Sequence, residues 1–105
     1  MKNFNDLIWK EHPIAKEAKL SGLSIFEENR NAEQAVMIFD NGFGISVIRN
    51  CPLINDGHKF EFAVLKGTKD KWKIVYDTPI TNNVERVDAS QDITSAMEKI
   101  QRLKL

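Results

Sequence analysis

Residues 34–49 read QAVMIFDNGFGISVIR, and this stretch predicts a β-hairpin. Asn41 and Gly42 stand between two runs rich in β-branched and aromatic residues, which favour strands. A two-residue type I′ turn needs positive φ at both central positions, and Asn and Gly tolerate that conformation best. Because the turn fixes the register, it places Ile38 opposite Ile45. The hairpin is therefore the anchor of the predicted sheet.

Both faces of this hairpin are apolar. In the predicted register one face carries Val36, Ile38, Ile45 and Val47, and the other carries Ala35, Met37, Phe39, Ser46 and Ile48. A hairpin with one face in water would alternate apolar with charged residues, so we expect both faces to be covered. A helix covers one. The N-terminal segment or a second copy of the chain covers the other, and we favour a homodimer.

Two further strands follow the hairpin. Residues Lys59 to Lys66 and Trp72 to Tyr76 alternate in the way typical of strands. The segment 50–58 between them and the hairpin is predicted to be a loop, because Pro52 cannot donate to a strand ladder and Asn55-Asp56-Gly57 favours a turn. Short connections in sequence order predict an antiparallel meander.

The C-terminal stretch changes to a helical period. From Ser90, the expected N-cap, to Leu103, apolar residues recur every three or four positions, and Ile93, Met97 and Ile100 are expected to be buried. The fold class is therefore α+β: an antiparallel β-meander of four to five strands with a C-terminal amphipathic helix packed on one face.

Two segments leave alternatives open. Residues 1–33 are an N-terminal extension or contribute an edge strand: Phe4, Leu7 and Ile8 suggest a short helical turn, and Leu20 to Phe26 has the composition of a strand. Between residues 79 and 89, Thr81 to Asn83 caps a helical turn or Val84 to Val87 forms a short strand. The whole chain, 1–105, is expected to be a single domain.

Composition narrows the function classes. The 15 basic and 15 acidic side chains cancel, which argues against a dominant nucleic-acid or membrane-surface footprint. The single Cys51 excludes an intrachain disulfide and a multi-cysteine metal site. No apolar run approaches the ~20 residues of a membrane span. We expect an intracellular protein that does not enter the membrane.

No catalytic, metal-ligating or cofactor-binding set has a recognisable spacing, so we expect no enzyme activity and no cofactor. Partner-contact candidates are Pro52, Leu53 and Ile54, which are apolar residues in a polar loop, together with His58 and Trp72. Trp72 stands among Lys66, Lys69, Lys71 and Lys73, a pattern that resembles a single-strand nucleic-acid platform. Glu61, Asp70 and Asp77 dilute that charge, which argues against nucleic-acid binding.

Three blocks in order carry a resemblance: FDNGFGISVI at 39–48, FEFAVL at 60–65 and YDTPITNNV at 76–84, followed by the closing helix. This arrangement resembles a family of small, functionally uncharacterised proteins of tailed phages and prophages, over about residues 34–103. The family typically has tyrosine in place of Phe43 and a glycine-rich loop in place of residues 51–57. The resemblance implies a viral or prophage origin and a place in the host-cell cytoplasm.

Two function classes follow. The first is a non-enzymatic host-interaction factor, such as an inhibitor of a bacterial defence system, that binds a host protein or sequesters a small nucleotide signal. The second is a structural or assembly accessory of the phage particle. A nucleic-acid-binding module is a weaker alternative, and a hydrolase is weaker still because no acid, base and nucleophile assemble from the sequence.

Overall fold

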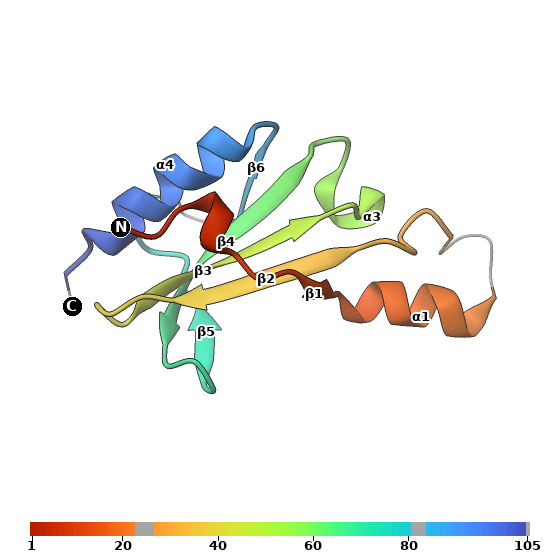
Figure 1. Ribbon diagram of the computed structural model, residues 1–105, viewed down its shortest axis with the longest axis horizontal. Coiled ribbons are helices and arrows are strands. Elements are labelled where there is room, and N and C mark those ends of the chain that lie inside the picture. The colour runs from red at the N-terminus through yellow and green to blue at the C-terminus, as the bar shows by residue number, and fades with distance from the viewer. Residues whose placement is uncertain (23–26, 81–83, 105) are drawn as a thin grey trace.

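The computed structural model describes residues 1–22, 27–80 and 84–104. It contains one antiparallel sheet with a C-terminal helix on one face (Figure 1), which confirms the predicted α+β class. In chain order the elements are the 3₁₀ turn η1 (Phe4–Asp6), β1 (Lys10–Glu11), α1 (Pro13–Ser21), β2 (Glu33–Ile38), β3 (Phe43–Arg49), α3 (Pro52–Asn55), β4 (Phe60–Gly67), β5 (Trp72–Ile74), β6 (Glu85–Val87) and α4 (Ser90–Gln101).

The predicted meander holds from β2 to β5, and β1 adds an edge strand beside β2, so that β1 to β5 lie side by side in sequence order. β6 departs from it by returning to β4, where Glu85 to Val87 pair with residues 60–62. β5 pairs with residues 65–67 of the same strand. Since β3 occupies the other edge of β4, β5 and β6 share one edge. β6 is the short strand predicted near Val84 to Val87; residues 81–83 lie outside the described ranges.

The turn of the β2–β3 hairpin differs from the prediction. The amide of Gly42 donates to Phe39 O (3.1 Å), the amide of Phe39 donates to Phe43 O (2.7 Å), and φ is positive at Gly42 (84°) but not at Asn41. This is a three-residue loop, a β-turn followed by a glycine in the left-handed region, rather than a two-residue type I′ turn. The extra loop residue shifts the register by one, so Met37 instead of Ile38 faces Ile45.

That shift changes which side chains share a face. Ala35 pairs with Val47 and Met37 with Ile45. Together with Phe39, they belong to the core cluster that α4 covers. Ile48 pairs with Gln34 on the opposite face. The predicted second face of Ala35, Met37, Phe39 and Ile48 is therefore wrong, because a one-residue slip moves one strand's whole set of side chains to the other side.

Helix α4 packs on the sheet as predicted. Ile93, Met97 and Ile100 are each 0% exposed and contact the apolar side chains of β3 and β4. Its ends differ slightly from the prediction. Ala89 rather than Ser90 occupies the N-cap, without a side-chain hydrogen bond, and the helix ends at Gln101 instead of Leu103. Leu103, beyond the end of the helix, still packs against the core cluster.

The N-terminal segment covers part of the same face. Leu7 is 7% exposed in the core cluster, and Phe4 packs edge-on against Phe60 with ring centroids 5.4 Å apart. The amide of Phe4 also donates to Thr94 Oγ1 of α4 (3.1 Å). The sequence predicted the N-terminal segment or a second copy on the face opposite the helix, but Phe4 and Leu7 lie on the helix side. On the opposite face, Ile14 and Ala15 of α1 belong to the same cluster as Ile48.

The edge strand beside β2 is not the predicted one. Lys10 and Glu11 pair with Gln34 and Glu33. Leu20 lies near the end of α1 and is 74% exposed, and Leu23 to Phe26 fall outside the described residues. None of the helices in the described ranges has the length and apolar content that a membrane crossing requires.

Candidate functional site

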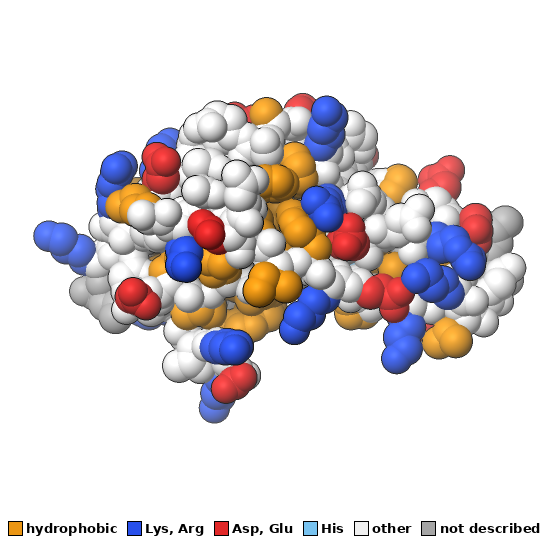
Figure 2. Space-filling view, in the orientation of Figure 1, with side chains coloured by type: hydrophobic (Ala, Val, Ile, Leu, Met, Phe, Trp, Pro, Cys, Tyr) orange, Lys and Arg blue, Asp and Glu red, His pale blue; other side chains and the backbone are white. Residues whose placement is uncertain are grey.

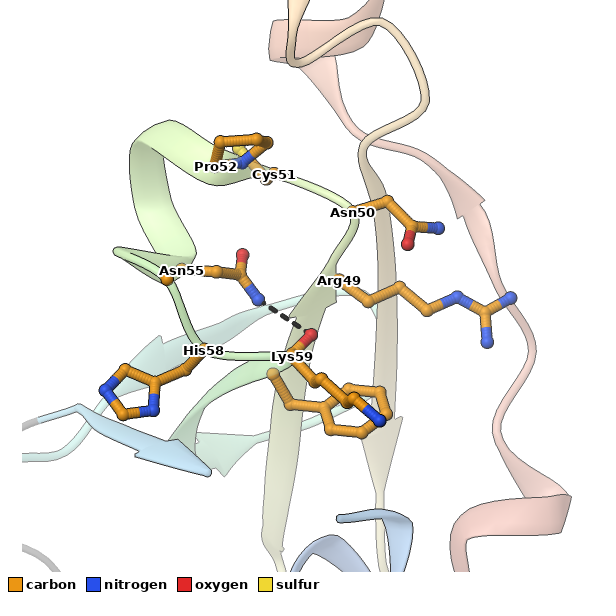
Figure 3. Close-up of a pocket in the computed structure, with 9 residues that line it drawn as sticks. Arg49, Asn50, Cys51, Pro52, Asn55, His58 and Lys59 are labelled. Carbon is orange, nitrogen blue, oxygen red and sulfur yellow. Dashed lines mark hydrogen bonds between the residues drawn. The ribbon is translucent and has the colours of Figure 1, made fainter. Parts of the chain in front are cut away.

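A cleft of about 520 Å³ opens between the end of β3, helix α3 and the start of β4. It is lined by Arg49, Asn50, Cys51, Pro52, Asn55, Gly57, His58, Lys59 and Phe60 (Figure 3). These residues lie at the end of the sheet away from both chain termini (Figure 1). The volume falls in the range of small-molecule sites, about 300–1,000 Å³.

One wall of the cleft is helix α3, where the sequence predicted a loop. Pro52 occupies the first helical position. Its missing amide hydrogen costs nothing there, because an amide at this position has no intrahelical acceptor. Asn29, which is 3% exposed, supplies the missing cap from a distant segment: its Oδ1 accepts from the amide of Leu53 (3.1 Å) and lies 3.4 Å from Cys51 Sγ. This contact across 24 residues of sequence holds the short helix in place.

Asn55 stands at the base of the cleft and is 2% exposed. Its Nδ2 donates to Ile48 O and to Lys59 O, both at 3.0 Å, which ties the end of β3 to the start of β4. Its Oδ1 is buried without a hydrogen-bond partner. Figure 3 shows this oxygen turned away from Lys59 and toward the Cys51 and Pro52 wall.

Arg49 is fixed at the end of β3. Its Nε and Nη2 each lie 3.1 Å from Glu33 Oε1, and its Cζ lies 3.8 Å from the centroid of the Trp9 ring. A guanidinium held by a carboxylate and an aromatic face loses little further entropy when it meets a ligand.

The opposite rim is held to the end of β6. Asp88 Oδ2 lies 3.2 Å from His58 Nδ1, and Asp88 Oδ1 accepts from the amide of Lys59 (3.2 Å). The hydrogen bond from His58, followed by the one from Lys59, lowers the pKa of the exposed Asp88 carboxyl. The carboxylate therefore stays charged and keeps the α3–β4 connection attached to the sheet.

The lining favours an anion. Arg49, His58 and Lys59 are among the nine lining residues and none of the nine is acidic, although Figure 3 shows the His58 ring turned away from Arg49 and Asn50. Glu33 forms an ion pair with Arg49, and Asp88 lies within hydrogen-bond distance of His58. Lys59 has no ion-pair partner in the part of the chain that the structure describes. Pro52 and Phe60 add apolar surface.

The one nucleophile in the wall is not set up for attack. Cys51 is 1% exposed, and burial raises the pKa of its thiol. A buried thiol with a raised pKa supplies little thiolate at neutral pH. Within the described ranges, no three His, Cys, Asp or Glu side chains come together as a set that could hold a metal ion.

The structure brings together four of the five predicted contact residues. Pro52 and His58 line the cleft, Leu53 is 65% exposed on the outer side of α3, and Ile54 packs beside the buried cluster of Ala15, Ala32 and Cys51. Trp72 lies apart on β5, which pairs with the far end of β4, and is 39% exposed.

Sequence reasoning missed Arg49, Asn50, Lys59 and the buried Asn29 and Asn55. One signal was present in the residue types: Asn and Asp adopt positive φ more readily than other non-glycine residues, and Asn50 and Asp56 do so in the structure, at 57° and 49°. No sequence pattern identified Asn29, because its contact with α3 depends on tertiary structure.

The chain was compared with protein-family models, with curated proteins and with solved structures. None of the three comparisons found a match.

Proposed function

We propose that this chain is a non-enzymatic binding protein of phage or prophage origin. Its cleft at α3 binds an anionic component of the host. The observation that carries the proposal is the cleft's lining, which combines Arg49 and Lys59 with apolar surface and no acidic residue. Among the functions expected from the sequence, this one corresponds to the host-interaction factor acting in the host cytoplasm, such as an inhibitor of a defence system.

The cleft suits binding because its walls are already held. Asn29 fixes α3, Asn55 joins the two strands, and Asp88 fixes the outer rim. A preorganised site binds more tightly because less conformational freedom is lost on binding. The buried Cys51 thiol, with its raised pKa, favours binding over covalent catalysis.

The weaker nucleic-acid alternative would use the β4–β5 hairpin. Lys69 and Lys71 are exposed there with Trp72, but Asp70 lies between them. Figure 2 shows acidic and basic side chains together at the tip of this projection. Mixed charge weakens the phosphate attraction on which nonspecific nucleic-acid binding depends.

A homodimer remains part of the proposal, on a different surface. The face from which it was inferred is covered by α4 and the N-terminal segment. A second copy would instead meet the opposite face of the sheet, where Val36 is 37% exposed. Sedimentation equilibrium tests this: a monomer at tens of micromolar would remove the dimer from the proposal.

The test is capture from host lysate by immobilised wild type and by two charge reversals, followed by mass spectrometry of proteins and small molecules. Lys59→Glu alters the cleft, and Lys71→Glu makes the same change on the exposed hairpin. We expect a ligand that wild type and Lys71→Glu retain and Lys59→Glu loses. Equal capture by all three proteins would exclude the cleft, and selective loss in Lys71→Glu would favour the hairpin. A chain found instead in stoichiometric copies in purified virions would support the structural role.

A further inference from the structure

Strand β2 has no neighbouring strand along most of its outer edge. β1 pairs only with Glu33 and Gln34, so within the described ranges no strand lies beside residues 35–38 on that side. Figure 1 shows β1 at the start of β2 and the hairpin turn at its end. Before β1, Trp9 turns to the α4 side of the sheet and packs against the core cluster. The stretch between β1 and the turn is therefore open to another strand.

The alternation of the ladder determines which backbone groups this edge presents. The amide of Phe39 donates to Phe43 O, so every second residue counted back from Phe39 bonds to β3. The amides and carbonyls of the residues between them, Val36 and Ile38, point away from β3. An edge that presents donors and acceptors in this way is a template for pairing with another strand.

The side chains do not protect this edge. Natural edge strands are shielded by charges, by proline or by short length. β5 and β6 follow that rule, because each has three residues and they carry Lys73, Glu85 and Arg86. In contrast, residues 35–38 read AVMI, without charge or proline, and Val36 is 37% exposed. The β2 edge therefore has the character of a pairing surface.

We propose that two copies of the chain pair through this edge, antiparallel, so that their two sheets become one. With the two-fold axis at Met37, Val36 exchanges hydrogen bonds with Ile38 of the second copy, and Ile38 does so with Val36 of the second copy. The outward groups of the edge thus complement themselves. This inference rests on the homodimer of the proposed function, specifies its surface and makes no use of the cleft.

The ends of the pairing are complementary in charge. Lys10 pairs with Gln34, directly beyond the open stretch, and Asp40 follows the other end of that stretch. In the antiparallel arrangement the exposed Asp40 of each copy comes next to the exposed Lys10 of the other, so two contacts between opposite charges form. A peptide of unrelated sequence has no such match. The edge therefore selects a second copy.

Cysteine cross-linking of the full chain tests this register. The two Met37 residues face each other as a non-hydrogen-bonded pair with Cα atoms about 4.5 Å apart, which a disulfide can span. The two Val36 residues are offset along the strands and lie roughly 8 Å apart, which is too far. We expect mild oxidation to yield a covalent dimer of Met37→Cys and none of Val36→Cys. Cys51 is 1% exposed and is present in both variants.

Sedimentation equilibrium tests the hydrogen bonds. Val36→Pro removes an outward amide, a change that an edge strand tolerates. Lys69→Pro is the matched control, because Lys69 is the second residue of the turn closed by Thr68 and Lys71, where proline is favoured. We expect wild type and Lys69→Pro to be dimeric at tens of micromolar, and Val36→Pro to dissociate at least about tenfold more readily. If Val36→Pro does not fold, the cross-linking decides.

The outcomes separate edge pairing from other contacts. A dimeric wild type without a covalent Met37→Cys dimer would overturn edge pairing and leave a dimer through the opposite face of the sheet, because Met37 lies on the α4 side. A monomeric wild type would overturn both kinds of dimer. Neither result affects the cleft, whose test is the capture comparison with Lys59→Glu.

Discussion

Asn41 shows how one side chain can serve two elements. Its Nδ2 donates to Ile100 O (2.8 Å) and Leu103 O (3.0 Å) at the end of α4, and its Oδ1 accepts from the amide of Phe43 (3.1 Å). The hairpin turn thus satisfies carbonyls that the helix terminus leaves without partners. Asn-Gly is typical of type I′ turns, but here the asparagine is explained by the contact with the helix.

Replacing this donor tests that explanation. Asn41→Asp keeps the shape of the side chain but turns an acceptor with a negative charge toward two carbonyl oxygens at a helix C-terminus. We expect a loss of about 1–3 kcal/mol in unfolding free energy at neutral pH, measured by urea denaturation. Asp40→Asn, in the same turn but exposed, should change stability by less than about 0.5 kcal/mol. Equal stability of Asn41→Asp and wild type would contradict the capping role.

Gly42 provides a second test at the residue scale. Its φ of 84° lies in the left-handed region, where a β-branched side chain clashes with its own backbone. Gly42→Val should therefore reduce the free energy of unfolding by more than about 1 kcal/mol. Gly42→Asn should lose less, because asparagine visits this region more readily. Similar losses for the two variants would indicate that the conformation at this position is not what limits the substitution.

His12 makes the start of α1 sensitive to pH. Its Nδ1 accepts from the amide of Ile14 (3.0 Å), which requires an unprotonated nitrogen, and burial lowers the pKa of the ring. As the pH falls below about 6.5, His12 is protonated in the unfolded chain before it is protonated in the folded chain. The stabilisation present above that pH is therefore lost as the pH falls from about 6.5 to the lower pKa of the folded state.

We expect His12→Asn to keep the N-cap and to flatten the change in urea midpoint between pH 7.5 and pH 5. His12→Ala should cost about 1 kcal/mol at pH 7.5, because it removes the cap. A midpoint of His12→Asn that falls with pH as steeply as that of wild type would assign the pH dependence to other groups.

At the scale of elements, α4 is held by its apolar stripe. Ile100 is 0% exposed among β3 and β4 side chains. Ile100→Asp would bury an unpaired carboxylate, so we expect a loss of several kcal/mol, about 3 or more. Gln91→Asp introduces the same side chain at an exposed position in the first turn, where a carboxylate suits the helix dipole, and should be nearly neutral. Melting of Ile100→Asp at the wild-type temperature would show that α4 is not packed as described.

The long periodic elements were predictable from sequence, and the short ones were not. The stripe of α4 and the alternation in β3 and β4 repeat over enough residues to identify helix and strand. α1 was missed because only Ala15 and Ala18 are buried in it, and small side chains give a weak stripe. α3 was missed because it is four residues long and its stabilising cap comes from Asn29. The register failed by one residue because Asn-Gly fits two hairpin loops of different length.

At the scale of the molecule, the cleft joins segments that the sequence keeps apart. Asn29, Asn55 and Asp88 come from three regions of the chain, yet each holds one wall of the same site. Sequence reasoning found the segment 52–58 because its composition is unusual for a loop. It could not identify the basic lining, because Arg49 and Lys59 become neighbours of one cleft only when β3 and β4 pair.

The most direct test of the account is a two-dimensional ¹H–¹⁵N NMR titration of the full chain with inorganic phosphate, as a probe for an anion in the cleft. We expect the largest shift changes at the amides of residues 49–51 and 55–60, around the cleft, with the hairpin amides of residues 68–74 unchanged. Changes confined to residues 68–74, or no saturable change at millimolar phosphate, would contradict binding at the cleft.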